Sequence, residues 1–384
     1  MVAVCLEHRF FRVGADVYTA LSFPYDYWRN YLQYFDSVTV VARVKVVEKI
    51  ESNFVLASGP GVTFSDMPYY VGPYEFVKKS ILMLVSAFRV VKENEQFILR
   101  SGNVSNAVWL FLMLSGKRYL REYPGNIKEG VVGVAGNGFL PLILASFLHV
   151  FAKLQSRYSV ANSFVSEYCR DVYGGSNSDF VFSSFRLSEV KIRKQSFQLV
   201  CESTLTIVSV GRLEGEKGHR DLFQAMNLLA AQGISTRLNL IGDGSCRKKL
   251  EEDAKELNIG VEFMGAVTDR ELVFEVLSKS DIFVLPSHTE GMPRALLEAM
   301  AVGLPCIGSR VGGVPEVLEL DWMVPSSQPD ALAKKIALSF NDLAWRKAGG
   351  NRNLDYVSSH FGDDGLNHKK LLFWRCLDDK ESCS

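Results

Sequence analysis

Two glutamates, Glu290 and Glu298, stand out because the segment that holds them could bind a phosphorylated ligand. They lie within SHTEGMPRALLEAMAVGLP, residues 287–305, directly after the apolar run DIFVLP. Pro293 suits the first position of a helix, and the free backbone N–H groups at a helix start favour an anion. In an open α/β sheet, ligands bind at the carboxyl ends of the strands, where this loop should lie. The segment predicts a ligand site, with a helix-capping Glu290 and a solvated Glu298 as the alternative.

Two cations follow a second strand-like run. Arg212 and Lys217 lie in SVGRLEGEKG, between the apolar LTIVSVG and the helical pattern HRDLFQAMNLLAAQG. Two positive charges on one strand-to-helix loop can neutralise a bound anion such as a phosphate. The loop therefore predicts an anion site, and a solvated basic loop is the alternative.

The elements that must position these residues alternate along the chain. Residues 37–44 and 96–100 are strand-like, residues 76–92 between them have a helical pattern, and the second half repeats this scheme. Such alternation predicts an α/β fold with parallel sheets covered by helices. A length of 384 residues favours two domains. The predicted parts are a first domain over residues 1–190, a second over 191–360, and a C-terminal crossover helix with a tail, 361–384, that packs back on the first domain.

The stretch between the two halves is polar and irregular. Residues 183–203 contain the basic KIRK and little periodic pattern, which predicts the linker between the domains. Near the C-terminus, Leu366, Phe373 and Leu377 are spaced to share one helical face, so a terminal helix should dock on a neighbouring element.

Composition excludes some classes of protein. Lysine plus arginine and aspartate plus glutamate both number 43, so the net charge is zero, and nucleic-acid binding is disfavoured. A hydrophobic share of 47% is that of a globular chain. The seven cysteines are scattered and odd in number, which favours reduced thiols over disulfides or zinc.

Several motifs, in order between residues 205 and 333, resemble the retaining glycosyltransferases of family 4, also called group 1, which have the two-domain GT-B fold. Glu290 and Glu298 match the E-x7-E motif of that family. The other matching segments are SVGRLEGEKGHRDLFQAM, LIGDGSCRKKLEE, VEFMGAVTDRELVFEVLSKSDIFVLPS, GSRVGGVPEVLE and MVPSSQPDALA. The resemblance implies two Rossmann-like domains that face each other across a cleft.

The resemblance also implies roles for individual residues. Arg212 and Lys217 would hold the donor diphosphate, and with Glu290, which would face the sugar hydroxyls near the reacting carbon, they would be the catalytic residues. Glu298 would bind the ribose hydroxyls of the nucleotide. No protein nucleophile is expected, because the departing diphosphate would help to deprotonate the acceptor.

Further donor contacts would come from backbone groups. Gly291, Met292 and Arg294 can offer N–H groups, whereas Pro293 cannot. Gly242 and Gly244 flank Asp243 in a turn that resembles a G-x-G segment near the nucleotide base, although such residues also make turns without a ligand.

The segment GSRVGGVPEVLE resembles the GG-x-P-E segment of the family, in which glycines turn the chain into a short helix near the donor. Gly312 and Gly313 permit that geometry, and Glu316 is expected either to contribute there or only to cap and be solvated.

The first half should bind the acceptor, but its motifs are weaker. Family members often have a glycine-rich loop after the first strand, whereas LEHRFFRVGADVYTAL has one glycine, Gly14. His8, expected at the end of that strand, is a candidate for the acceptor side of the cleft, with a structural histidine as the alternative. Residues 116–126 occupy the place of the family's mid-domain histidine without containing one, so no catalytic histidine is assigned.

The expected function is transfer of a sugar from a UDP- or GDP-sugar donor to a glycan or lipid-linked acceptor, in surface polysaccharide or lipopolysaccharide biosynthesis. No cofactor and no metal are expected. An epimerase acting on nucleotide sugars and a non-catalytic binding protein are the alternatives on the same scaffold. A dinucleotide oxidoreductase is disfavoured, because Pro141 replaces the third glycine in GVAGNGFLP.

The segment from Val131 to Ala152 is nearly uncharged and about long enough to cross a bilayer. Asn137, Pro141 and the glycines favour a buried strand, loop and helix, and a surface that makes peripheral contact with a membrane is the alternative. Met1 leads directly into VAVCLE without a signal-peptide pattern. The sequence thus predicts a cytoplasmic protein, with the inner face of the membrane as a possible site of action.

Overall fold

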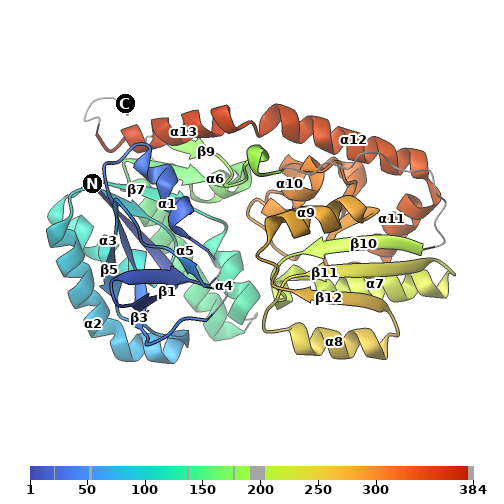
Figure 1. Cartoon of the computed structure of the whole chain (residues 1–384), viewed down its shortest axis with the longest axis horizontal. Helices are drawn as coiled ribbons and strands as arrows, with labels where there is room; N and C mark the ends of the chain where they lie inside the picture. The colour runs from blue at the N-terminus through green and yellow to red at the C-terminus, as the bar shows by residue number, and fades with distance from the viewer. Residues whose placement is uncertain (21, 52–53, 136–137, 176–177, 191–203, 379–384) are drawn as a thin grey trace.

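The computed structural model describes residues 1–20, 22–51, 54–135, 138–175, 178–190 and 204–378, and only the backbone of 133–135. Two α/β units lie side by side, each built on its own sheet, and two C-terminal helices run across both (Figure 1). This is the α/β fold with two Rossmann-like domains that the alternating pattern and the resemblance imply.

The first sheet is parallel at its centre. Its parallel pairs join the strands in the order β5-β3-β1-β6-β7-β8-β9. The short strands β2 and β4 add to it in antiparallel fashion. The strand bounds are β1 Val2–Val13, β2 Asp16–Thr19, β3 Val38–Val46, β4 Val55–Leu56, β5 Val62–Met67, β6 Phe97–Leu99, β7 Tyr119–Tyr123, β8 Ala161–Phe164 and β9 Asp179–Val181.

Helices cover this sheet on both faces, and their buried sides form its core with the strands. Val2, Val4 and Trp28 belong to the cluster on one face, whereas Ala3, Cys5 and Val108 belong to the other, as the two-residue period of a strand requires. The helices are α1 Tyr25–Leu32, α2 Gly72–Glu93, α3 Asn103–Ser115, α4 Ile127–Ala135, α5 Phe139–Arg157 and α6 Glu167–Tyr173, followed by the 3₁₀ turn η1 Leu187–Glu189.

The second sheet is wholly parallel, with the strand order β12-β11-β10-β13-β14-β15. The order reverses between β10 and β13, and in doubly wound sheets a ligand binds at such a point, outside the carboxyl ends of the strands. The strands are β10 Thr204–Val210, β11 Ser235–Ile241, β12 Gly260–Gly265, β13 Ile282–Leu285, β14 Cys306–Ser309 and β15 Met323–Val324.

The helices of this unit alternate with its strands. They are η2 Gly215–Lys217, α7 His219–Ala231, α8 Arg247–Glu256, α9 Arg270–Lys279, α10 Arg294–Ala301, η3 Val314–Glu316, η4 Leu320–Trp322, α11 Pro329–Asn341 and α12 Leu343–His360. The core of the second unit also takes in Phe185 and Val190, which precede its first strand. The rest of the predicted linker, 191–203, lies outside the described residues.

The terminal helix α13, Asp363–Arg375, returns to the first unit, as expected. Phe373, Trp374 and Leu377 are buried in the same cluster as Val2 and Trp28. In Figure 1 the red helices α12 and α13 run in succession over the second and then the first unit. The C-terminal helix therefore ties the two units together by hydrophobic contact.

Two local predictions are wrong. The first strand does not end near His8 but continues to Val13, because Gly14, at φ +59°, makes a two-residue turn into β2. The interpretation of residues 131–152 as buried strand, loop and helix also fails, since α4 and α5 occupy the segment apart from 136–137, which lie outside the described residues. Much of the outward side of α5 is exposed.

Candidate functional site

A cleft of about 1110 Å³ lies between the two units and is lined by residues of both. On the second unit it is bordered by the loops that follow β10, β11 and β12 and by the start of α10. Four of the predicted site residues line it: Arg212, Gly242, Arg294 and Glu298. The predicted convergence at the carboxyl edge of the second sheet is therefore present for these four.

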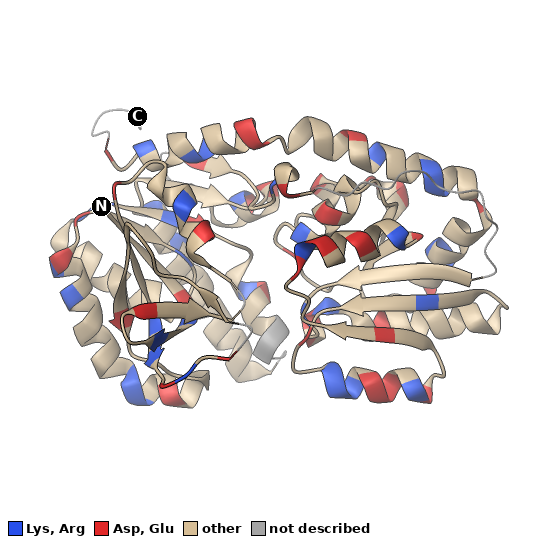
Figure 2. Ribbon diagram, viewed as in Figure 1, with Lys and Arg blue, Asp and Glu red and all other residues tan. Residues whose placement is uncertain are grey.

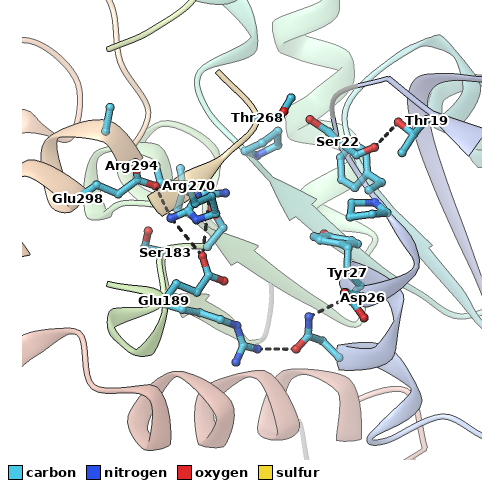
Figure 3. Close-up of a pocket in the computed structure, with 18 of the residues that line it drawn as sticks. Thr19, Ser22, Asp26, Tyr27, Ser183, Glu189, Thr268, Arg270, Arg294 and Glu298 are labelled. Carbon is cyan, nitrogen blue, oxygen red and sulfur yellow. Dashed lines mark hydrogen bonds and ion pairs between the residues drawn. The ribbon is translucent and has the colours of Figure 1, made fainter. Parts of the chain in front are cut away.

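Glu298 is buried in this wall and holds two arginines. Its Oε1 accepts hydrogen bonds from Arg294 Nε at 2.8 Å and from an Arg270 guanidinium nitrogen at 3.1 Å. Both arginines also face Glu189, and Figure 3 shows them between the two carboxylates. The alternative of a solvated Glu298 is wrong, because only 6% of the residue is exposed.

The pattern of the sequence did not single out Arg270. Asp269 caps α9 by accepting from the backbone N–H groups of Glu271 and Leu272, which sets Arg270 at the first position of that helix. This start follows β12, so it lies at the same sheet edge as the other site loops. An arginine at a helix start beyond a parallel strand was the signal that could have found it.

Glu290 forms a second, separate ion pair. Its Oε1 lies 2.7 Å from Lys217 Nζ and accepts a hydrogen bond from Ser287 Oγ at 2.6 Å. The exposed fractions of the two charged side chains are 19% for Lys217 and 9% for Glu290. The alternative in which Glu290 caps α10 is wrong, because the N-cap residue is Pro293 and no side chain caps this helix. Pro293 therefore lies one position before the first helical residue, the position predicted for it.

Arg212 is the most accessible of the predicted cations. Its side chain is 65% exposed and donates to Glu216 Oε1 at 2.8 Å. Glu216 itself is buried. A long exposed guanidinium beside the cleft can turn from this carboxylate to an anion without loss of packing.

Two glycines let the site loops pack closely. At Gly242, φ is +145° and an added Cβ would lie 1.8 Å from the carbonyl oxygen of Gly211. At Gly244 an added Cβ would lie 2.5 Å from the carbonyl oxygen of Leu213. Gly244 is not among the cleft-lining residues, so close packing of two loops is the role that the geometry supports for it.

The turn at Gly312 and Gly313 and the short helix η3 are confirmed. Gly312 has φ +51°, and an added Cβ would lie 1.7 Å from the carbonyl oxygen of Glu290. The Gly313 N–H donates to the Gly291 carbonyl oxygen at 2.9 Å. This glycine pair therefore supports the loop that carries Glu290.

Gly291 lies where the two units meet. An added Cβ would come within 3.0 Å of the Pro124 carbonyl oxygen and 3.1 Å of Gly125 Cα, both in the first unit. Thr289 donates to Glu129 of that unit as well. Met292 packs against the second core. The predicted donor loop is thus also an interdomain contact.

Glu316 does cap a helix, but the helix belongs to the other unit. Its carboxylate accepts from the backbone N–H groups of Glu167 at 2.9 Å and Tyr168 at 2.8 Å, at the start of α6. Burial raises the pKa of Glu316, and the two backbone hydrogen bonds oppose that shift. A carboxylate at a helix N-terminus is favoured by the helix dipole.

The first unit contributes a charged cluster that sequence patterns missed. Arg100 follows β6 and forms an ion pair with Glu122 at 3.5 Å, and Tyr31 donates to the same carboxylate at 3.3 Å. Arg100 also donates to Tyr27. Lys370 of α13 lines the same cleft, where burial and the neighbouring Arg186 lower its pKa to about 8. Arg100, Glu122, the α1 tyrosines and Lys370 lie on separate elements, so no spacing in the sequence could reveal the cluster.

His8 and Gly14, the weak acceptor-side candidates, are not among the residues that line the cleft. His8 bonds to Thr19 Oγ1 at 2.8 Å, and burial lowers its pKa to about 4. Thr19 and Phe23 line the cleft, and His8 contacts it only behind them, through the Thr19 hydroxyl and an edge-to-face ring contact with Phe23 at 5.1 Å. Gly14 serves the turn between β1 and β2. The geometry thus gives His8 a structural contact, the alternative stated for it, and gives Gly14 a turn.

Within the described residues, no group of three or more His, Cys, Asp or Glu side chains is placed to hold a metal ion. Lys217 and Glu290 occupy each other, and the two arginines occupy Glu298. The carboxylates of Glu290 and Glu298 are therefore paired with lysine and arginine side chains. The absence of a metal requirement stays a prediction.

Comparison with known proteins agrees with this geometry. Residues 204–342 match the family described as glycosyl transferases group 1. The chain is 24% identical to protein CapJ of Staphylococcus aureus over 93% of both chains. It is 36% identical to the amylovoran biosynthesis glycosyltransferase AmsK of Erwinia amylovora, but over only 34% of each chain.

Anabaena Alr3699/HepE, solved with UDP-glucose, has the same fold. Its TM-score is 0.68 at 14% identity, over 97% of this chain and 98% of that one. These findings support a GT-B glycosyltransferase. The group 1 match covers the unit that carries Arg212, Lys217, Glu290 and Glu298, which is where the resemblance of the motifs placed the donor site.

Proposed function

We propose that the protein is a retaining glycosyltransferase of family 4 that transfers a sugar from a UDP- or GDP-sugar to a glycan or lipid-linked acceptor. Surface polysaccharide or lipopolysaccharide assembly is the proposed process, and the cytoplasm, at the inner face of the membrane, is the proposed place. The observation that carries the proposal is the gathering of Arg212, Gly242, Arg294 and Glu298 around one interdomain cleft, at the switch point of a group 1 domain.

The proposed roles follow from the charges. Arg212, which is exposed beside the cleft, and Lys217 stabilise the diphosphate as the bond to the sugar breaks. Glu290 accepts hydrogen bonds from the donor sugar, and Glu298 accepts from the ribose hydroxyls. Backbone N–H groups at Gly291, Met292 and Arg294 complete the donor site, with Gly242 and Gly244 shaping the loop beside the base. No metal or cofactor takes part.

The role proposed for Glu298 places the strictest geometric requirement on how the donor binds. Its Oε1 is engaged by Arg270 and Arg294, so the ribose must use the second oxygen or displace an arginine. Glu189 is the second partner of both arginines and could hold them after such an exchange. Carboxylate oxygens have about four lone-pair sites between them, so a shared role is feasible.

Thermal unfolding with UDP, GDP, ADP, dTDP and NAD tests the donor site. A ligand present at about 100 times its Kd stabilises the native state by about 2.7 kcal/mol, which raises the unfolding temperature. We expect a shift with UDP or GDP that is lost in Arg212→Ala. The matched control is Arg220→Ala, an arginine that is also well exposed but pairs with Asp253 on α8. A shift with NAD alone would overturn the proposal.

Product analysis separates the remaining readings. Transfer with the anomeric configuration of the donor preserved, read by NMR, supports a retaining glycosyltransferase. An inverted anomer would refute the retaining mechanism. Conversion of the nucleotide sugar to its epimer without an acceptor would identify an epimerase, and binding without turnover over a panel of acceptors would identify a binding protein.

A further inference from the structure

The first unit exposes a broad apolar surface on three helices. The outward sides of α2, α3 and α5 carry large hydrophobic side chains that are between 39% and 83% exposed. Soluble monomers rarely leave contiguous apolar patches beyond a few hundred Å², and larger ones mark interaction sites. The exposed side chains are Tyr74, Val77, Ile81, Leu82, Leu84, Val85 and Phe88 on α2, Leu110, Met113 and Leu114 on α3, and Phe139, Leu140, Leu142, Ile143, Leu144, Phe147, Val150 and Leu154 on α5.

These helices form one continuous surface, here named the α2-α3-α5 face. Phe88 of α2 meets Phe111 of α3 edge to face, with ring centroids 5.6 Å apart. Trp109 of α3 meets Phe151 of α5 in the same way at 4.7 Å. Figure 1 shows α2 and α3 on the outer side of the first unit, away from the second. No residue of α2, α3 or α5 is among those that line the interdomain cleft, so the face is separate from it.

The charge around this face differs from that of the whole chain. Residues 72–158 contain eleven lysines and arginines and five glutamates. Leaving out Arg100 and Glu122, which line the cleft, and the buried Arg121, nine cations and four glutamates remain, a net charge of +5 in a chain whose net charge is zero. In α2 the charged residues lie toward the two ends, with uncharged turns between them (Figure 2). The exposed cations on these helices and on α4 are Lys78, Arg89, Lys92, Lys128, Lys153 and Arg157.

We propose that the α2-α3-α5 face docks on a lipid bilayer that contains anionic headgroups. Apolar helix faces flanked by lysine and arginine lie in the plane of a membrane interface, with the apolar side chains at the acyl boundary and the cations at the headgroups. The excess of positive charge selects a negatively charged surface. This inference does not rest on the proposed catalytic function.

The face lies on the bilayer and does not span it. Within the described residues, Phe139–Arg157 alone is long and apolar enough to cross a membrane by length and composition, with 22% of its most apolar window buried in the protein. Buried hydrogen bonds hold its inner side to the sheet. Tyr119 Oη donates to the Gln155 carbonyl oxygen at 2.7 Å, Tyr123 Oη donates to that of Ala152 at 2.6 Å, and Arg121 Nε donates to the Gln155 side chain at 2.9 Å.

A second copy of the chain fits the face less well. In a twofold dimer each copy presents the same surface to the other, so two positively charged rims would face each other. An anionic bilayer instead neutralises that rim. Charge complementarity thus favours the membrane as the partner.

Vesicle cosedimentation without any nucleotide tests the inference. The full chain is mixed with vesicles of phosphatidylcholine alone, or of phosphatidylcholine and phosphatidylglycerol in equal amounts. We expect binding to the anionic vesicles, weaker binding to the neutral ones, and release as salt is raised. Ile81→Glu and Leu140→Glu should each weaken binding at least about tenfold, because they place a carboxylate among the apolar side chains.

The control is Leu320→Glu, which changes a residue of the second unit that is 66% exposed. It should bind as the unchanged chain does. Because Ile81 is 75% and Leu140 76% exposed, their variants should fold, as circular dichroism checks. Absence of binding by the unchanged chain, or equal binding by all variants, would overturn the inference. So would light scattering that shows a dimer broken by Ile81→Glu without any vesicle binding.

Discussion

Replacing Lys217 by methionine tests whether the pair with Glu290 is a structural element of the site. Removing one partner of a buried ion pair costs about 3–5 kcal/mol, because a charge stays buried without compensation. Here Lys217 is 19% and Glu290 9% exposed, and the Ser287 hydroxyl still donates to the carboxylate. We therefore expect the free energy of unfolding to fall by less, about 2–3 kcal/mol, in urea denaturation followed by circular dichroism.

A double-mutant cycle isolates the pair. Lys217→Met and Glu290→Gln together should destabilise by less than the sum of the single changes, with a coupling of at least about 1 kcal/mol. The matched control is Lys279→Met, whose partner Glu275 lies beside it on the surface of α9 and whose loss should cost about 0–1 kcal/mol. If Lys217→Met is no more harmful than Lys279→Met, or if the single changes simply add, the reasoning is refuted.

Three further predictions follow from single contacts. Gly312→Ala should destabilise by more than about 3 kcal/mol, because its Cβ would collide with a backbone carbonyl, whereas Gly14→Ala, with a similar positive φ but open space, should cost about 1 kcal/mol; equal losses in denaturation would contradict this. The hydrogen bond to Asp221 raises the pKa of His288, so stability from this pair is present below the usual histidine pKa and lost as pH rises, and Asp221→Asn should cost more at pH about 5.5 than at pH about 8. Glu316→Ala removes two hydrogen bonds between the units, at the start of α6, so the units should separate more easily and the radius of gyration in small-angle scattering should increase. An unchanged scattering profile would contradict this prediction.

The strands of the second unit and the residues that follow them could be predicted from the sequence, because they depend on local sequence patterns. Runs such as LTIVSVG and DIFVLP became the buried parallel strands β10 and β13, and the residues that follow such strands reach one sheet edge by topology alone. This is why Arg212 and Glu298, 86 positions apart in the numbering, were correctly placed around one cleft.

The first unit was not readable to the same depth. Its cleft wall combines Arg100 after β6, Glu122 in β7 and Lys370 in α13, and only the return of the terminal helix brings the last of these to the others. The extension of β1 past His8 was also missed, since one glycine turn at Gly14 decides whether the chain pairs with itself or enters a loop. Such outcomes depend on tertiary pairing, which periodicity does not contain.

The ion pairs of Arg212, Lys217 and Glu298 limit how these residues could contact a ligand. A motif names Arg212, Lys217 and Glu298 as ligand contacts, but in this structure each is held by an opposite charge of the protein. The proposed donor diphosphate must then replace a carboxylate as the partner of each cation. This replacement is easiest where the cation is exposed. Arg212 is 65% exposed and Lys217 19%, so Arg212 should engage the diphosphate first, and Lys217 should follow only if Glu290 turns toward the sugar. Donor binding and the release of Glu290 for its proposed contact would thereby be one coupled event.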